Sequence, residues 1–332
     1  MKKKINISIS GLGNVGKKHA EFVKKYNKSK LLSIFDTSLV KKKNDKNIVR
    51  SYTNLVKNDN CDVVVIASPD HSHYKQIMQS LKYKKNIFVE KPICTNLKEL
   101  KNISNEWKRN KHQIILRSNL ILRTSPLFLW LKKQIRKKYF GEVYSIDVEY
   151  LYGRLNKFVK GWRGKKESYS AMSGGGIHMI DLACWLTNQF PIEVSSNTSN
   201  LATKQFKVRS KDLFHSSLKF KSGLVLRASA NLSCVFKHQH TIKIFGTKKT
   251  FIYDDLGPRI YSSRNMNSKH KKIKLKSLPE NKTNILKEFI DNLYKKKSLT
   301  DDTVFDLKIM NILCACNLSE KKSKKIKKKD II

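Results

Sequence analysis

Three glycines near the start of the chain are spaced to bind a phosphate group. They follow residues 5–9, where apolar side chains alternate as in a short β-strand. In a G-x-G-x-x-G turn the first glycine permits a tight bend, the second lets backbone N–H groups approach a pyrophosphate, and the third lets the next helix pack closely. We expect that helix over residues 17–26, with its N-terminus directed at the phosphates. The predicted dinucleotide-binding turn consists of Gly11, Leu12, Gly13, Asn14, Val15 and Gly16.

A carboxylate follows the next apolar run. Residues 31–35 lead into Asp36, twenty positions after Gly16, which is the spacing at which dinucleotide-binding folds place an acid for the ribose hydroxyls. Such a carboxylate accepts a hydrogen bond from the 2′-OH of NAD and repels the 2′-phosphate of NADP. The sequence therefore favours NAD over NADP. Residues 41–43, all lysine, would soften this preference if they folded toward the ribose.

The chain carries a large excess of positive charge. Its 332 residues include 69 Lys and Arg against 26 Asp and Glu, a formal net charge of +43. Such an excess could mark a binder of nucleic acid or of an anionic membrane. However, only 11 of the basic residues are arginine, the better reader of phosphates and bases, and the lysines are scattered. We predict weak, salt-sensitive adhesion to polyanions and no specific nucleic-acid partner.

The cysteines do not form a metal-binding pattern. No C-x-x-C pair occurs, and Cys314 and Cys316 lie in an apolar helical run, so we interpret them as buried thiols and predict no metal site. Reduced thiols suit a cytoplasmic location. No apolar segment has the length of a membrane span, and the first residues lead into a strand rather than a signal-peptide core. We therefore expect a soluble protein without a membrane partner.

The order of elements predicts an α/β chain of two domains. Over residues 1–122, strands alternate with helices, which indicates a Rossmann-type parallel sheet. Over residues 123–320 we expect an α+β domain with a largely antiparallel, open-faced sheet, whose exposed face favours a dimer or tetramer. Residues 321–332 read as a disordered basic tail. The second domain would contain strands at 143–152, 213–220, 224–230, 240–245 and 250–253, a helix at 177–186, and closing helices at 284–295 and 303–318.

Polar motifs follow two buried strands of the first predicted domain. Ser68, Pro69 and His73 lie just after the run at 62–67, and Glu90-Lys91-Pro92 follows the run at 87–89. Open α/β sheets bind ligands at the carboxyl ends of their strands, so these residues are candidates for cofactor contacts. The first motif could instead simply break the strand and cap a helix over 73–82.

These motifs together resemble the Gfo/Idh/MocA family of nicotinamide-dependent sugar and polyol oxidoreductases. The resemblance extends to Asn119, Arg123 and Pro126, to the run 140–143, to the glycine-rich stretch from Gly174 to Asp181, and to the turn 245–250. It implies that the Lys91 ammonium donates a hydrogen bond to the substrate oxygen that becomes a carbonyl. It also implies that His178 is the general base that takes the hydroxyl proton. The alternative for His178, a lone histidine on an apolar helix, is a structural role.

One position departs from the family pattern. Many members carry an aspartate four residues before the histidine, where this chain has Gly174. Asp181, one helical turn after His178, is the nearest carboxylate in the sequence and hence the candidate third catalytic residue. The departure leaves open a second function, a binding or sensor protein that keeps the fold without catalysis.

The resemblance also indicates the substrate side of the site. Members of this kind act on sugars, cyclitols or nucleotide-activated sugars for surface polysaccharides, so a small-molecule substrate of that class is expected. An aromatic ring could stack on the sugar, and arginines, Arg154 included, could bind a carboxylate or diphosphate. The predicted substrate-binding residues are Asn119, Arg123, Tyr152, Trp162, Arg163 and His178.

Overall fold

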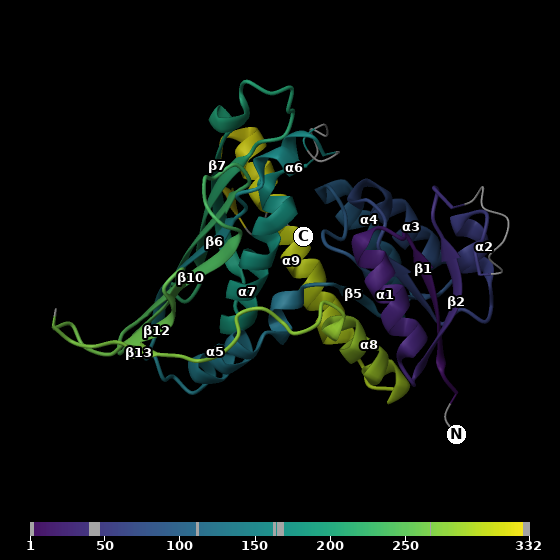
Figure 1. Ribbon diagram of the computed structural model, residues 1–332, viewed down its shortest axis with the longest axis horizontal. Helices are drawn as coiled ribbons and strands as arrows, with labels where there is room; N and C mark the ends of the chain where they lie inside the picture. The colour runs from purple at the N-terminus through teal and green to yellow at the C-terminus, as the bar shows by residue number, and fades with distance from the viewer. Residues whose placement is uncertain are drawn as a thin grey trace. The chain divides into compact units, whose positions relative to one another are not determined.

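The computed structural model describes residues 3–39, 47–110, 113–161, 164, 169–265 and 267–327. The chain divides into two compact units (Figure 1). The first comprises Met1–Ile121 and Glu280–Met310, and the second comprises Leu122–Pro279 and Asn311–Ile332.

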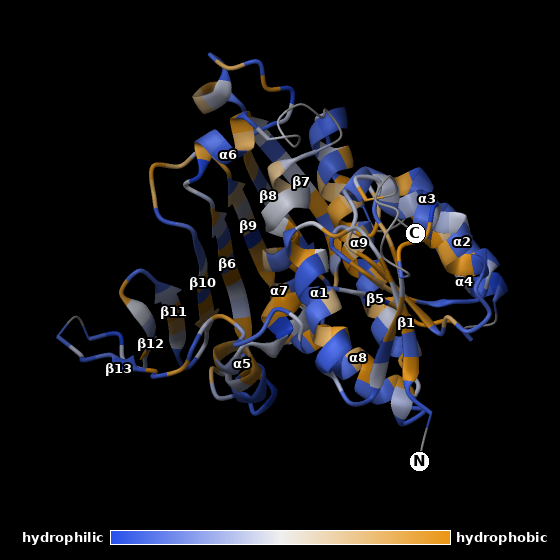
Figure 2. Ribbon diagram, turned by 45° about the vertical axis from the view of Figure 1, so that its right-hand side comes forward, coloured by the Kyte–Doolittle hydropathy of each residue, from blue (hydrophilic) through white to orange (hydrophobic). Residues whose placement is uncertain are grey.

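The first unit contains a parallel sheet. Within the described residues, five strands follow the order β2-β1-β3-β4-β5. All side chains of β3 are fully buried, which explains its unbroken β-branched sequence, because both faces of a doubly wound sheet are covered. In Figure 2 the strands around β1 are accordingly apolar. The predicted Rossmann-type sheet is confirmed. Its strands are β1 (Ile5–Ser10), β2 (Ser29–Phe35), β3 (Val63–Ile66), β4 (Asn86–Val89) and β5 (Leu116–Ser118).

Helices cover this sheet. The first helix begins at Asn14, three residues before the predicted start, because Gly13 already occupies the N-cap position. The fourth is capped by Asn96, whose side chain accepts a hydrogen bond from the backbone N–H of Glu99. These helices are α1 (Asn14–Lys25), α2 (Tyr52–Lys57), α3 (Asp70–Lys82), α4 (Leu97–Arg109) and α8 (Asn284–Tyr294).

The domain boundaries expected from the sequence need one correction. Residues 280–310 belong to the first unit and not to the second. The cause is packing: α8 buries Ile285, Leu286, Phe289 and Ile290 in the same apolar core as Ile7 of β1. The start of α9 (Thr300–Lys322) is likewise fixed to β5, because the Asp306 carboxylate accepts a hydrogen bond from the Ser118 N–H at 2.9 Å.

The second unit contains a large mixed sheet. Its strand order within the described residues is β13-β12-β11-β10-β6-β9-β8-β7-β14. Only the β6–β9 pair is parallel among these described pairings, so the predicted largely antiparallel sheet is confirmed. The strands are β6 (Val143–Leu151), β7 (Pro191–Ser199), β8 (Leu213–Phe220), β9 (Val225–Asn231), β10 (Gln239–Gly246), β11 (Thr250–Asp254), β12 (Gly257–Tyr261), β13 (Lys271–Lys272) and β14 (Ile326–Lys327).

Helices lie against one face of this sheet. Figure 1 shows α5 (Pro126–Arg136), α7 (Ile177–Thr187) and the end of α9 on that face. Most residues of α7 are buried, which matches its almost continuous apolar sequence. A short helix, α6 (Leu155–Val159), follows β6, and the segment Met172–Gly176 forms one π-helical turn before α7.

The basic tail is shorter than predicted. The last helix continues to Lys322, and Ile326 then pairs with Val194 of β7, with only 1% of its surface exposed. A single apolar side chain among lysines thus anchors this stretch, and Lys325 lies 3.3 Å from the carboxylate of Glu193. Residues 328–332 lie outside the described part of the chain.

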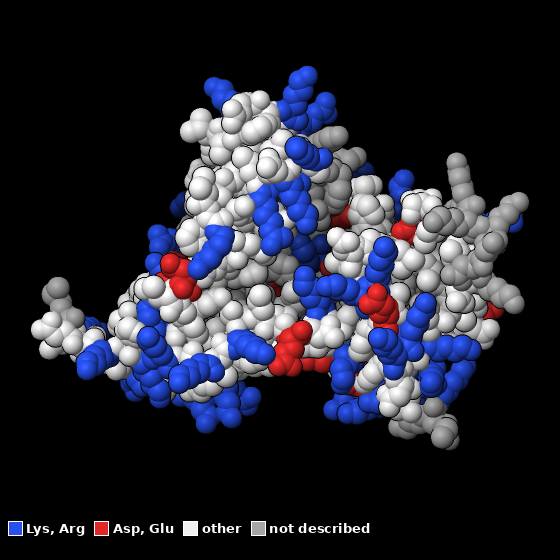
Figure 3. Space-filling model, in the orientation of Figure 1, with Lys and Arg blue, Asp and Glu red and all other residues white. Residues whose placement is uncertain are grey.

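Two surface properties complete the description. None of the helices in the described ranges has an apolar stretch long enough to cross a bilayer. Lys and Arg side chains are spread over the face of the molecule seen in Figure 3, and few Asp or Glu lie among them.

Candidate active site

The glycine turn between β1 and α1 has the geometry of a phosphate-binding loop. Gly11 has a positive φ of 90°, and a Cβ there would overlap the backbone of Ala67 and Ser68. A Cβ at Gly16 would overlap the Gly11 carbonyl group, whereas a Cβ at Gly13 would meet no atom within 4 Å. The first and third glycines are therefore needed for packing, and the second borders open space. The first turn of α1 carries no acidic residue, so its N-terminus is suited to an anion.

Asp36 lies beside this turn. Its carboxylate accepts a hydrogen bond from the Leu12 N–H at 2.7 Å and from the Ser38 N–H at 2.9 Å. Burial raises the pKa of Asp36, but these hydrogen bonds outweigh it and hold the pKa below its usual value. The carboxylate is thus negatively charged at neutral pH, at the place where a ribose would lie next to the turn. Residues 41–43 lie outside the described residues.

The turn after β3 is tied to the turn that carries Lys91. The ring of His73 lies with Nδ1 2.7 Å from the Pro92 carbonyl oxygen and Nε2 2.9 Å from the Ser68 carbonyl oxygen. His73 is 1% exposed. Ser68 directs its hydroxyl to Gln76 at 2.8 Å. The ring nitrogens of His73 thus join two backbone segments, which shapes the site, and the predicted contact of His73 with the cofactor stays a prediction.

Glu90 is held from two sides. His19 Nε2 lies 2.9 Å from its Oε1, and the Asn119 side-chain amide donates to the same oxygen at 2.7 Å. Burial raises the pKa of Glu90, but its hydrogen bonds with His19 and Asn119 and the charge of Lys91 bring the pKa below its usual value. The carboxylate thus remains charged beside Lys91, which is half-buried at the carboxyl end of β4.

In the second unit, His178 adjoins a group of aromatic rings. The ring centroid of His240 lies 6.5 Å from that of His178 and 5.3 Å from that of Tyr150. His238 contacts Tyr150 and Tyr152 at 5.2 and 5.0 Å. A Cβ at position 175 would overlap the Tyr150 ring, so the glycine there lets the helix start approach the sheet. His178, His240, Tyr150 and Tyr152 are half-buried and His238 is exposed, so a ligand can reach this group.

Arg123 and Asp181 form a buried ion pair. The Arg123 Nε donates to the two carboxylate oxygens of Asp181 at 3.0 and 3.1 Å, and both side chains are buried, 6% and 1% exposed. This ion pair lies between the segment after β5 and α7. The pair anchors the helix that carries His178. The substrate role expected for Arg123 and the catalytic role expected for Asp181 stay predictions.

The remaining predicted residues divide by unit. The first unit holds the glycine turn, Asp36, Lys91 and Asn119, and the second holds Tyr152 and His178. Trp162 and Arg163 lie outside the described residues. Sequence reasoning missed His19, His238 and His240. A signal existed for two of them, because the alternation His238-x-His240 at a strand start places both rings on the face that carries Tyr150.

The parallel sheet, the glycine turn and Asp36 define an NAD-binding Rossmann domain, and with it a dinucleotide-dependent oxidoreductase. Residues 5–118 match the family model described as oxidoreductase family, NAD-binding Rossmann fold, and residues 128–252 match the GFO/IDH/MocA C-terminal domain. The chain therefore belongs to the Gfo/Idh/MocA family of NAD(P)-dependent dehydrogenases.

Known proteins match over most of the chain. Myo-inositol 2-dehydrogenase of Thermotoga maritima is 25% identical over 264 residues, which are 76% of each chain. The 2,7-anhydro-N-acetylneuraminate hydratase of Escherichia coli is 24% identical over 269 residues, which are 75% of this chain and 68% of the relative. The structure of scyllo-inositol dehydrogenase from Lactobacillus casei with NAD(H) and scyllo-inositol has a TM-score of 0.76 at 18% identity and covers 98% of this chain and 99% of its own. The family and these relatives support an NAD-dependent oxidoreductase of sugars or cyclitols.

Proposed function

We propose that the chain transfers a hydride between NAD and a secondary hydroxyl of a sugar, cyclitol or nucleotide-activated sugar. The glycine turn is the observation that supports NAD binding. Of its three glycines, Gly13 alone borders open space, and Asp36 lies beside the turn. The substrate half is supported by His178 among accessible aromatic rings, since such rings pack on the apolar faces of a sugar.

In the proposed mechanism, two side chains act on the substrate hydroxyl. The imidazole of His178, on α7, is the general base that accepts its proton. The ammonium group of Lys91 donates a hydrogen bond to the same oxygen and stabilises its developing negative charge. Bound NAD⁺ supplies the hydride acceptor. Glu90, fixed by His19 and Asn119, keeps a negative charge next to Lys91 and favours its protonated form.

Lys91→Ala tests this function. We expect NAD to bind the variant as it binds the native protein, measured by calorimetry, while NADH formation falls at least about 100-fold. Lys75→Ala, an exposed change on α3, is the matched control and keeps full activity. The substrates to screen are myo-inositol, scyllo-inositol, glucose 6-phosphate and UDP-sugars. Equal activity of Lys91→Ala and the native protein contradicts the proposed role of Lys91.

A second candidate function is a non-catalytic sensor of NAD and a sugar. Gly174 favours it, because no carboxylate stands one turn before His178. The two functions separate in one experiment: a sensor binds NAD and a sugar from the panel in calorimetry but forms no NADH with any of them.

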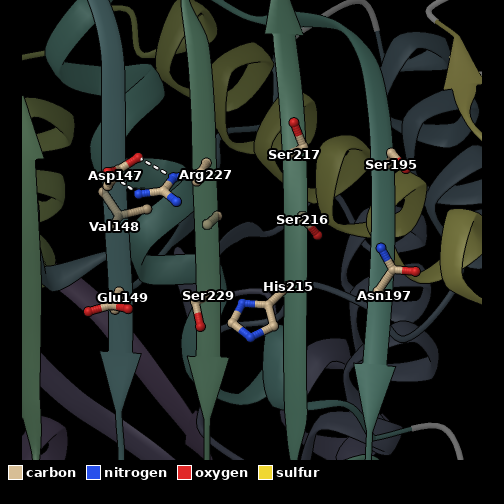
Figure 4. Close-up of a pocket in the computed structure, with 11 residues that line it drawn as sticks. Asp147, Val148, Glu149, Ser195, Asn197, His215, Ser216, Ser217, Arg227 and Ser229 are labelled. Carbon is tan, nitrogen blue, oxygen red and sulfur yellow. Dashed lines mark hydrogen bonds and ion pairs between the residues drawn. The ribbon is translucent and has the colours of Figure 1, made fainter. Parts of the chain in front are cut away.

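We also propose that the uncovered face of the second sheet joins two copies of the chain. This face contains a pocket of about 360 Å³ (Figure 4), in which Arg227 Nε donates to Asp147 at 2.7 Å. Glu149 and His215 point to the same face, among serines and Asn197. Both signs of charge occur together, so the face can complement itself across a two-fold axis.

A further inference from the structure

A row of aromatic rings connects His178 with the end of β6 in the second unit. The His240 ring contacts those of His178 and Tyr150. The rings of Tyr150 and Tyr152 are stacked, with centroids 5.9 Å apart and planes at 11° to each other. Residues two apart in extended backbone point to the same face, so the row follows one face of the sheet. A sugar that presents a hydroxyl to His178 can pack its apolar faces on these rings.

Arg154 extends this row beyond Tyr152. Its guanidinium carbon lies 5.4 Å from the centroid of the Tyr152 ring, which is a cation–π distance. Arg154 is exposed, and among the residues that the structure describes no carboxylate pairs with its guanidinium. The N–H groups of a guanidinium form a planar fork that matches the paired oxygens of a phosphate or a carboxylate. This side chain is therefore suited to bind an oxyanion at the edge of the aromatic row.

The backbone fixes the place from which the Arg154 side chain starts. The Arg154 N–H donates to the Tyr152 carbonyl oxygen at 2.7 Å, and the Arg154 carbonyl oxygen accepts a hydrogen bond from the Lys157 N–H at 3.0 Å. A Cβ at Gly153 would overlap the carbonyl oxygen of Phe236, so the chain packs closely on the loop before β10. These contacts limit the positions that the guanidinium can take.

The acidic residues of β6 lie on the other face of the sheet. Asp147 and Glu149 alternate with Tyr150 and line the pocket on the uncovered face (Figure 4). There the Asp147 carboxylate accepts a hydrogen bond from Arg227, and the Glu149 carboxylate accepts one from the Thr241 hydroxyl. No acid of β6 therefore opposes the positive charge of the arginine on the face that carries the rings.

We propose that Arg154 binds a phosphate or carboxylate group of the substrate, while the sugar ring with the reacting hydroxyl packs along Tyr150 toward His178. This inference rests on the proposed function for the reaction itself. It adds the class of the substrate, a sugar with an oxyanion apart from the hydroxyl that is oxidised. Arg154 does not touch the reacting atoms, so its role is to determine specificity.

Calorimetry with matched ligands tests this proposal. With NAD present, the native protein should bind glucose 6-phosphate, glucuronate or UDP-glucose about 10-fold or more tightly than glucose. The ligand that gains most distinguishes a phosphate monoester, a carboxylate and a diphosphate. Arg154→Gln should remove the gain and keep the affinity for glucose. A native protein without preference for any of the three charged sugars, or a variant that keeps the preference, overturns the proposal.

Two further variants separate Arg154 from the general positive charge of the chain. Lys157→Gln, an exposed change on α6, removes a positive charge three residues away and should keep the preference. Arg154→Lys keeps the charge without the planar fork and should retain only part of it. Equal losses in Lys157→Gln and Arg154→Gln would show diffuse attraction and contradict a site at Arg154. Urea midpoints of these exposed variants should equal the native midpoint, which checks that they fold.

Binding and turnover separate this inference from the proposed function. A protein that binds a charged sugar through Arg154 but forms no NADH supports the inference and contradicts the dehydrogenase. A protein that oxidises myo-inositol but binds charged sugars no better than glucose supports the dehydrogenase and overturns the inference.

Discussion

The Nδ1 atom of His73 lies 2.7 Å from the carbonyl oxygen of Pro92, the residue that follows Lys91. Through Nε2 the same ring reaches Ser68 on the turn after β3. The two turns stand at the carboxyl ends of neighbouring strands, where the cofactor site of an open α/β sheet is built. The position of Lys91 therefore depends on a buried side chain that lies 18 residues earlier in the sequence.

His73→Leu should destabilise the first unit. A neutral imidazole donates through one N–H, so the change leaves one carbonyl oxygen without its donor, at about 1–3 kcal/mol. The free energy of unfolding from urea titration measures this loss. His71→Leu, an exposed neighbour, should change it by less than about 0.5 kcal/mol. Similar losses in both variants would argue against the tie between the turns.

His73 should also make stability depend on pH. Burial lowers the pKa of His73 below its usual value, although its hydrogen bonds with the Pro92 and Ser68 carbonyls oppose this. The unfolded chain then binds more protons than the folded chain near the usual histidine pKa of about 6.5. The stabilisation that comes from keeping His73 neutral and buried is complete above about pH 6.5. It is lost as the pH falls toward the pKa that His73 has in the folded protein. Urea midpoints measured from neutral to mildly acidic pH should fall less in His73→Leu than in the native protein.

The glycine turn was predictable because its requirements are local. A positive φ at Gly11 and a close approach at Gly16 concern neighbouring backbone, and the register to Asp36 follows from one helix and one strand. The partners of charged side chains could not be predicted in this way. Arg123 and Asp181 are 58 residues apart, and His19 and Glu90 are 71 apart, so only the tertiary fold decides these contacts.

The surface against which α8 packs could not be predicted from the sequence either. Its apolar face, with Ile285 and Phe289, predicts that the helix is buried, but not against which sheet. The sequence order suggested the second domain, whereas the packing places it on β1. Hydrophobic periodicity gives the buried face of a helix, and the partner surface depends on shape complementarity that a single sequence does not reveal.

Phe289→Ala tests the corrected boundary. Phe289 is 1% exposed and contacts Phe88 of β4 at a ring-centroid distance of 5.7 Å. Its removal should lower the free energy of unfolding of the first unit by about 3–5 kcal/mol and weaken NAD binding with it. Lys282→Ala, an exposed change before α8, is the control. If Phe289→Ala leaves both the unfolding free energy and NAD binding at native values, α8 is not part of the core.

Asp36→Ala should change the cofactor preference. The carboxylate stands beside the glycine turn and keeps its negative charge at neutral pH, because hydrogen bonds from Leu12 and Ser38 overcome the effect of burial on its pKa. Loss of a hydrogen bond to a charged group, about 1.5–3 kcal/mol, should weaken NAD binding about 10- to 100-fold. The affinity for NADP should fall less than the affinity for NAD, or should rise, because the repulsion of its 2′-phosphate is removed. Calorimetric titration with both nucleotides measures the ratio of the NAD affinity to the NADP affinity. An unchanged ratio would contradict the role of Asp36.

Ser217→Arg tests the uncovered sheet face as the contact between copies. Ser217 is exposed on β8 and lines the pocket that contains Asp147 and Arg227 (Figure 4). A long charged side chain in this pocket prevents close approach of a second sheet. Light scattering after gel filtration should show a dimer or tetramer for the native protein and a smaller species for the variant.

Two further measurements make that result specific. NAD affinity of Ser217→Arg should equal the native value, because the glycine turn and Asp36 belong to the first unit, so a loss of binding would indicate misfolding instead of dissociation. Asn105→Arg, an exposed change on α4, adds the same side chain away from the sheet and should keep the native assembly. A native protein that is monomeric at micromolar concentration, or a variant that assembles as the native protein does, would remove this face as the interface.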